Sequence, residues 1–252
     1  MSTVSVSSPI QREPELLGQT VVVIGGSAGI GFGTARRARA EGAKVILTGR
    51  NAERLQQAAS EVDALSTAAF DATDSVALER FFRDLPAIDH VMVTAGRPYY
   101  GRLAEMDFAE IRGLIGEHLS QAIYVARYAA NKVRPGGTLI FMGGTGGRRP
   151  ALGMSINGAV TAALPALIAN LALEIAPVRV NLIAAGFVDT PLSAELLGDQ
   201  LEKRRNQLRT TLPIRRVVGP ADVAALAVHI MTNTALTGAT YDIDGGQQFV
   251  NA

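Results

Sequence analysis

The chain has 252 residues, of which 48% are hydrophobic and 19% charged, and its formal net charge is +1 at pH 7. This composition supplies a large core, and so small a net charge gives no reason to expect binding to nucleic acid or to an anionic membrane. The chain lacks cysteine, which excludes disulfides, cysteine metal sites and thiol catalysis. Its three histidines, His90, His118 and His229, are too scattered for a metal motif, so we expect no metal site.

The N-terminal stretch and the lack of long apolar runs indicate where the protein is found. Residues 1–18 contain Ser, Val and Pro without an apolar core segment, and we expect a flexible arm there rather than a signal peptide. No apolar run approaches the roughly 20 residues of a membrane-spanning helix. Residues 19–252 show no internal repeat or linker. We therefore expect one soluble, cytoplasmic domain that contacts neither membrane nor nucleic acid.

The first patterned stretch, residues 21–31, runs from four apolar β-formers into a cluster of glycines, and a helix-compatible segment follows it. A strand, a glycine turn and a helix start form a phosphate-binding unit, because glycines let the backbone approach a pyrophosphate and the first helical N–H groups point at it. The spacing of Gly25, Gly29 and Gly31 differs from the G-x-G-x-x-G fingerprint. A glycine turn of purely structural role is therefore the alternative.

The rest of the chain alternates between strand and helix patterns. Further strands are expected at 44–48, 67–70, 90–93, 138–142, 178–183 and 239–243. Helices are expected at 30–41, 52–62, 75–84, 107–134, 154–175 and 220–231, with a polar, partly helical segment at 190–212. This alternation predicts an α/β fold, a doubly wound parallel sheet with helices on both faces that binds a ligand at the carboxyl ends of its strands. We interpret the charge run at 202–205 as a solvated helix face.

Seven short segments occur together in an order and spacing that resemble the short-chain dehydrogenase/reductase family over about residues 17–250. These segments are 25–31, 71–74, 94–96, 173–176, 179–181, 186–191 and 242–246. The resemblance implies a Rossmann-type fold and a nicotinamide dinucleotide cofactor. It also implies a homodimer or homotetramer built on the two long helices.

The end of the second predicted strand indicates which dinucleotide is bound. An acidic residue there would accept hydrogen bonds from a ribose 2′-OH and repel a 2′-phosphate. The residue here is Gly49, followed by Arg50, whose guanidinium can pair with phosphate, so we expect NADP(H) in preference to NAD(H). A solvated Arg50 beside the helix cap Asn51 is the alternative. The glycine turn and the resemblance imply these further cofactor-binding residues: Gly25, Ser27, Ala28, Gly29, Ile30, Asp71, Ala72, Ala95, Gly96, Val188 and Thr190.

The catalytic residues of the family are replaced in this sequence. The family uses a Ser, a Tyr-x-x-x-Lys on the next helix and an Asn on the preceding helix, and its ammonium lowers a phenol pKa that is otherwise about 10. By alignment these positions fall at Gly144, Asn157, Thr161 and His118, and the chain contains no Tyr-x-x-x-Lys. A positioned acid or base contributes about 10²–10⁴ in rate. Its loss argues against ordinary alcohol–ketone exchange without forbidding hydride transfer.

Other polar residues are candidates for the missing roles. His118 is a candidate acid because imidazole titrates near neutrality, and the Asn157 amide can hydrogen-bond a carbonyl without transferring a proton. The substrate-binding candidates are Thr145, Tyr99, Tyr100 and Arg148. His118, the two tyrosines and Arg148 have structural alternatives: a packed or interface histidine, aromatics at a rim, and a loop charge in solvent or at a subunit contact.

Two functions fit these observations. The first is an NADP(H)-dependent oxidoreductase with a non-standard active site, transferring hydride to a small organic carbonyl, enone or imine; an iminium already carries positive charge and needs little acid. The second is a catalytically inactive NADP-binding sensor or assembly subunit, and a lyase or isomerase step around a structural dinucleotide is a third. We favour the first by analogy with the family, and expect residues 190–212 to close over the substrate.

Overall fold

The computed structural model of the chain describes residues 15–148 and 150–250. Most of the predicted arm, residues 1–14, therefore lies outside the described residues. Its last residues, 15–18, form a turn in which Leu16 is fully buried and donates its N–H to the carbonyl of Glu41 at 2.9 Å. This end of the arm is thus part of the domain.

Seven strands form one sheet in the order β3-β2-β1-β4-β5-β6-β7, and every neighbouring pair is parallel. The strands are β1 (Thr20–Ile24), β2 (Lys44–Gly49), β3 (Ser66–Ala69), β4 (Ile88–Val93), β5 (Val133–Gly144), β6 (Arg179–Ala185) and β7 (Thr240–Ile243). The strand order reverses between β1 and β4, which places a topological switch point at their carboxyl ends. The predicted Rossmann-type, doubly wound α/β domain is confirmed.

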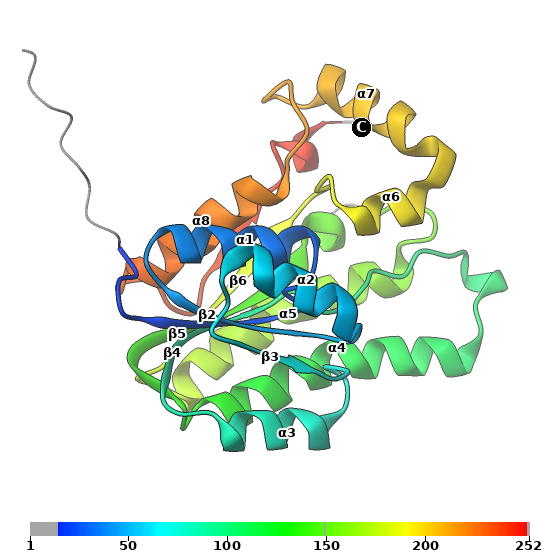
Figure 1. Ribbon diagram of the computed structural model, residues 1–252. Helices are drawn as coiled ribbons and strands as arrows, with labels where there is room; N and C mark the ends of the chain where they lie inside the picture. The colour runs from blue at the N-terminus through cyan, green and yellow to red at the C-terminus, as the bar shows by residue number, and fades with distance from the viewer. Residues whose placement is uncertain (1–14, 149, 251–252) are drawn as a thin grey trace, which may run out of the picture.

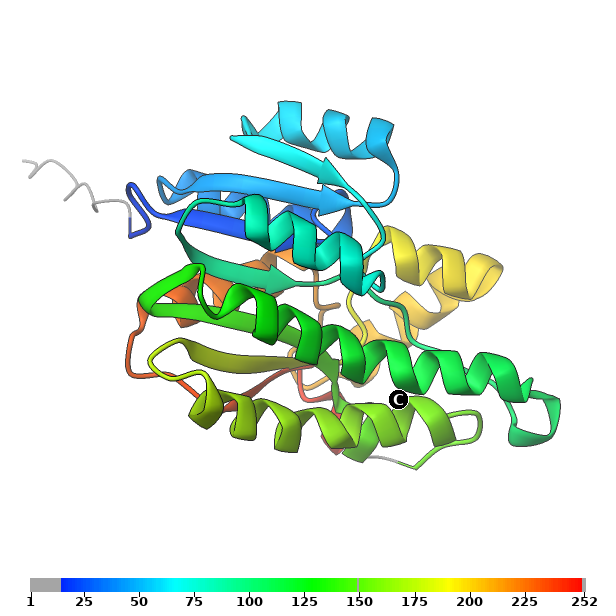
Figure 2. The ribbon, with the colours of Figure 1, turned by 90° about the horizontal axis from the view of Figure 1, so that it is seen from below.

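Helices cover both faces of this sheet (Figure 1). They are α1 (Gly29–Ala40), α2 (Ala52–Val62), α3 (Ser75–Asp84), α4 (Phe108–Ala129), α5 (Ser155–Glu174), α6 (Pro191–Leu197), α7 (Leu201–Thr211) and α8 (Pro220–Thr232). Helices α1, α2 and α8 pack on one face and α3, α4 and α5 on the other, where α4 and α5 run side by side (Figure 2). Helices α6 and α7 lie beyond the carboxyl ends of the strands (Figure 1).

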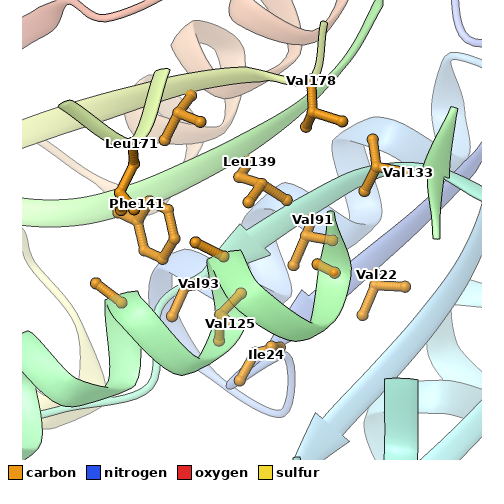
Figure 3. Close-up of a cluster of buried hydrophobic side chains, with 14 of the residues drawn as sticks. Val22, Ile24, Val91, Val93, Val125, Val133, Leu139, Phe141, Leu171 and Val178 are labelled. Carbon is orange, nitrogen blue, oxygen red and sulfur yellow. The ribbon is translucent and has the colours of Figure 1, made fainter. Parts of the chain in front are cut away.

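The apolar runs of the central strands are long because the sheet is buried on both faces. Successive side chains of a strand point to opposite faces, so Val22 and Ile24 join one buried cluster while Val21 and Val23 join the other. Figure 3 shows the first cluster, in which valines of β1 and β4 meet Val125 of α4. Both clusters, one on each face of the sheet, extend to the carboxyl ends of the strands.

One predicted boundary is wrong. The helix expected at 107–134 ends at Ala129, and strand β5 begins at Val133. Long-range bonds override helix propensity here, since the Lys132 ammonium donates to the carbonyls of Arg83 and Leu85, each at 2.8 Å. The Lys132 carbonyl in turn accepts from the N–H of Ile88 at 2.8 Å, which ties this segment to β4.

Helix α5 corrects a second expectation. Among the described residues it is the one helix long and apolar enough to cross a membrane, with a mean hydropathy of 1.6 over its most apolar window. One side of it packs in the core through Leu164 and Ile168, and Pro165 lies inside the helix as predicted. Leu173 on another side is 80% exposed. The position of α5 against the sheet is that of a core helix with an apolar outer surface.

Candidate functional site

The turn between β1 and α1 is possible only with glycine. Gly25 has a φ of +90°, and a Cβ there would lie 2.6 Å from the amide nitrogen of Ala95. A Cβ at Gly31 would lie 2.2 Å from the carbonyl oxygen of Gly25. Both distances are too short for any side chain, so these glycines hold the backbone close to the end of β4.

Helix α1 starts at this turn without a side-chain cap. Its N-cap residue is Ala28, which has no side-chain acceptor, so the first N–H groups of the helix lack such a partner. The amides of Gly25 and Gly26 instead donate to the carbonyl of Thr48 at 3.1 and 2.9 Å, which fixes the turn against β2. An uncapped helix N-terminus behind a tight glycine turn fits a pyrophosphate.

The ends of β2 and β3 bring the predicted adenosine-binding residues to one place. Gly49 lies beside Ser27, whose Oγ would be 3.3 Å from a Cβ at position 49. The pKa of Asp71 is lowered mainly by the hydrogen bond from the N–H of Thr73, with the positive charge of Arg50 adding to the effect and partial burial opposing it. Arg50 therefore lies near enough to Asp71 to interact with it. Ala72, next to Asp71, is buried.

A cleft of about 670 Å³ opens at the carboxyl ends of the strands, continuous with the glycine turn. Five predicted cofactor-binding residues line it: Ile30, Ala95, Gly96, Val188 and Thr190. Gly29 joins this band because a Cβ there would touch the Thr190 side chain at 3.4 Å. Thr190 also starts α6, with its Oγ1 accepting from the N–H of Ser193 at 3.1 Å. The structure thus brings residues of three separate segments together along one edge of the sheet.

The four positions that correspond to the family's catalytic residues all line this cleft: His118, Gly144, Asn157 and Thr161. The Nε2 of His118 lies 3.6 Å from where a Cβ of Gly96 would be. The Thr161 hydroxyl donates to the carbonyls of Asn157 and Gly158 at 2.8 and 3.1 Å, so it is held by the helix backbone. Among the described residues that line the cleft there is no lysine, aspartate or glutamate.

The substrate-binding candidates divide into two pairs. Thr145 and Tyr100 line the cleft, and Thr145 is buried. Tyr99 and Arg148 are not among the cleft-lining residues. Arg148, in the short 3₁₀ turn after β5, forms an ion pair with Asp242 and donates to Oε1 of Gln248 at 3.1 Å. The structure therefore directs Arg148 to the C-terminal segment rather than to the cleft.

Sequence reasoning missed Arg204. The charge run at 202–205 is not the uniformly solvated face that we expected, since Arg204 lines the cleft and Arg205 donates to Oδ1 of Asp189 at 2.7 Å. The signal was available, because residues 201, 204, 205 and 208 follow helical spacing and Leu208 is buried. The two arginines therefore share the inner face of α7.

Gln247 and Gln248 from the C-terminal segment also line the cleft. Gln247 accepts from the N–H of Phe187 through its side-chain oxygen at 2.8 Å. No sequence pattern indicated them, because they reach the site only through contacts with distant residues.

Comparison with known proteins agrees with this arrangement. A sequence profile of the family described as enoyl-(acyl carrier protein) reductase matches residues 25–248. The short-chain dehydrogenase/reductase ATR9 of Stachybotrys chlorohalonatus is 28% identical, over 92% of this chain and 98% of that protein. The cyclic-di-GMP-binding biofilm dispersal mediator protein of Escherichia coli is 29% identical, over 90% and 96%. The crystal structure of BdcA in complex with NADPH matches with a TM-score of 0.83 at 28% identity, over 92% of this chain and 95% of that chain.

The profile match begins at the glycine turn, ends at the last residue that lines the cleft, and so includes the strand ends between them. The chain belongs to the short-chain dehydrogenase/reductase family.

Proposed function

We propose that the protein is an NADP(H)-dependent oxidoreductase with a non-standard active site, acting on a small organic carbonyl, enone or imine. The observation that carries the proposal is that a nucleotide-binding turn adjoins a cleft. A turn that admits only glycine and an uncapped helix N-terminus form a nucleotide cradle, and this cradle opens directly into a mostly apolar cleft. The NADPH complex of BdcA, a relative of known structure, supports this choice of cofactor.

The residues would hold the dinucleotide in a defined order. The N-terminus of α1 would hold the pyrophosphate, Asp71 and Ala72 would flank the adenine, and Arg50 would pair with the 2′-phosphate. Val188 and Thr190, which line the cleft, would contact the nicotinamide end. Bound NADPH supplies the hydride for the reaction.

The chain's own residues then position the substrate. We propose that Asn157 and Thr145 donate hydrogen bonds to the substrate oxygen or nitrogen, while His118 delivers the proton where one is needed. The described lining contains no lysine, and burial raises the pKa of the cleft phenol Tyr100, an effect that the charge of Arg204 only partly offsets. Substrates that need little acid assistance, such as iminium ions, should therefore react faster than simple ketones.

A sensor without turnover is the second candidate function. It is favoured by the Thr161 hydroxyl, which is held by the helix backbone and cannot replace a lysine. The binding activity named for the E. coli relative is a precedent for a non-catalytic role in this family. In this case NADP(H) binding would serve ligand sensing or assembly with an active relative.

Calorimetry and steady-state kinetics distinguish the two. We expect purified protein to bind NADPH more tightly than NADH, and to oxidise NADPH with at least one iminium or enone from a panel that also contains ketones. Tight NADPH binding without turnover across the panel would contradict the oxidoreductase and support the sensor. Absence of binding to either nucleotide would contradict both.

His118 is tested separately with His118→Ala. We expect lower turnover of ketones and a changed pH profile, with little effect on iminium substrates, which need no proton at the reacting atom. Unchanged turnover and pH profile for every substrate would remove His118 from the mechanism.

We also propose that the protein is cytoplasmic and assembles as a homodimer or homotetramer through α4 and α5. The apolar outer surface of α5 supports this, because a helix that is apolar all round is usually buried. Ile123 of α4 and Leu173 of α5 are 45% and 80% exposed in the single chain.

A further inference from the structure

Two arginines, Arg97 and Arg204, line the cleft, and the described lining itself contains no carboxylate. Arg97 is neutralised at the rim, where it forms an ion pair with Glu195 of α6 at 3.2 Å. Arg204 differs, because no described carboxylate lies within ion-pair distance of it, and its Nη1 donates to Oε1 of Gln207 at 2.9 Å.

The neighbouring Arg205, on the same helix, has a guanidinium whose charge is paired within the protein. Arg205 is bound by two carboxylates, Asp189 and Glu202. Arg204 is half-buried instead, and burial lowers its pKa. Among the described residues no carboxylate offsets the free-energy cost of desolvating its charge. Tyr100 also lines the cleft and lies within electrostatic range of Arg204. A partly desolvated guanidinium and a phenol hydroxyl therefore line the same cleft as two hydrogen-bond donors.

Much of the remaining lining is apolar. It includes Leu192, Leu196 and Leu197 of α6, together with Met154, the N-cap residue of α5. A ligand that matches both features has an anionic group at one end and an apolar body.

We infer that Arg204 and Tyr100 bind a carboxylate of the substrate, so that the preferred substrates are carbonyl, enone or imine compounds with an apolar body and a carboxylate at one end. This inference rests on the proposed function and narrows its substrate class. A guanidinium presents two parallel N–H groups that match the two oxygens of a carboxylate. The phenol hydroxyl adds a third donor.

Binding is tested on the NADPH-loaded protein with octanoate and octanol, which share an apolar body and differ in charge. We expect Arg204→Met to weaken octanoate by about 10-fold or more, the usual effect of losing a charge-assisted hydrogen bond, and to leave octanol unchanged. Arg204→Lys should recover part of the loss. Arg209→Met is the matched control, because Arg209 lies exposed on the same helix and donates to Asn206 at 2.7 Å.

Turnover is tested with oxo-alkanoates from levulinate upward, each compared with its methyl ester. We expect a higher kcat/KM for the acid than for the ester, with the difference lost in Arg204→Met mainly through KM. Arg204-dependent octanoate binding without turnover would uphold this inference and contradict the proposed function. Equal turnover of acids and esters, unaffected by Arg204→Met, would contradict the inference and leave the function standing. Weakening of NADPH itself by Arg204→Met would assign the residue to the cofactor and also contradict the inference.

Discussion

At the scale of single residues, the two arginines proposed to bind anionic groups differ in their exposure to water. Arg50 lies exposed just after β2, and the preceding residue, Gly49, has no side chain to obstruct it. Arg204, in the proposed substrate site, is partly withdrawn from water. One cation therefore suits a solvated phosphate and the other suits a group that enters a cleft.

The first prediction at this scale concerns Arg50. Arg50→Met should weaken NADPH by about 10-fold or more and leave NADH nearly unchanged, because only NADPH carries the 2′-phosphate with which a charge-assisted bond forms. Arg54→Met, one turn along on α2 and also exposed, is the matched control. Titration calorimetry with both nucleotides gives the answer, and equal losses for the two would refute the assignment.

The second prediction concerns His90, which is 2% exposed on β4. Burial lowers its pKa to about 4, the positive charge of Arg179 adds to this, and Asp89 opposes it. Its Nε2 lies 2.6 Å from Oε1 of Gln19, while its buried Nδ1 has no hydrogen-bond partner among the described residues, so a second ring proton would find no acceptor there. The unfolded chain, with a histidine pKa of about 6.5, therefore binds the proton more readily than the folded protein.

The sign of the effect follows directly. The free energy of unfolding should fall as pH falls from about 6.5 to about 4, by about 3 kcal/mol from this group alone. His90→Asn removes the titrating ring, and urea unfolding across this pH range should show a shallower loss than in the unchanged protein. Identical slopes for the two proteins would show that His90 is not responsible.

At the scale of elements, the local pattern of the sequence was enough to predict the alternating strands and helices and the caps. Asn51 accepts from the N–H of Arg54 at 2.8 Å, and Asp74 caps α3 through two backbone N–H groups. What could not be predicted depends on residues far apart in the chain. Lys132 ends α4 through carbonyls of another helix, and Arg148 is drawn away from the cleft by Asp242, 94 residues later.

The same distinction holds for the site. The glycine turn of the proposed cofactor site could be predicted because a strand, a run of glycines and a helix start are adjacent in the sequence, although the contact that requires Gly25, with Ala95, joins distant residues. The substrate half could not, since α7 and the C-terminal segment contribute Arg204 and Gln247 by folding back over the strand ends. Helical spacing indicated which face of α7 turns inward, but not what that face would meet.

A prediction at this scale concerns the N-terminal part of α5, where Asn157 and Thr161 occupy the positions of the family's Tyr and Lys. A Cβ at Gly144 would lie 3.4 Å from Cγ2 of Thr161, an ordinary contact, so a serine fits there. The triple variant Gly144→Ser, Asn157→Tyr, Thr161→Lys should raise kcat/KM for a simple ketone by about 10²–10⁴, the usual contribution of a positioned acid. Asn157→Tyr alone should give little, because its phenol lacks the ammonium. Absence of any gain, with NADPH binding retained, would show that the cleft geometry and not only its chemistry has diverged.

At the scale of the whole molecule, the apolar outer surfaces of α4 and α5 set the expected assembly. Figure 2 shows these helices side by side on the same face of the sheet, with no further layer over them. A leucine that is exposed in the single chain would be buried at such a contact between two chains. Its replacement by glutamate should weaken association, because burial of an unpaired carboxylate is unfavourable.

Leu173→Glu should therefore dissociate the expected dimer or tetramer without changing NADPH affinity, because Leu173 lies at the far end of α5 from the cleft-lining residues. Leu65→Glu is the control, as Leu65 is 58% exposed before β3 and lies outside both helices. Sedimentation velocity measures the outcome. An unchanged oligomer, or a monomer in the original protein, would contradict the expected interface.

The ion pair of Arg148 with Asp242 has a practical consequence for anyone who handles this protein. Asp244, which is 5% exposed, accepts from the N–H groups of Gly246 and Gln248 at 2.8 and 2.9 Å. These bonds fix the conformation of the stretch that carries Gln247 and Gln248. Gln247 and Gln248 of that stretch line the cleft. Substitutions confined to residues 246–250 should therefore change the shape of the cleft and its preference among ligands, while leaving the glycine turn unchanged.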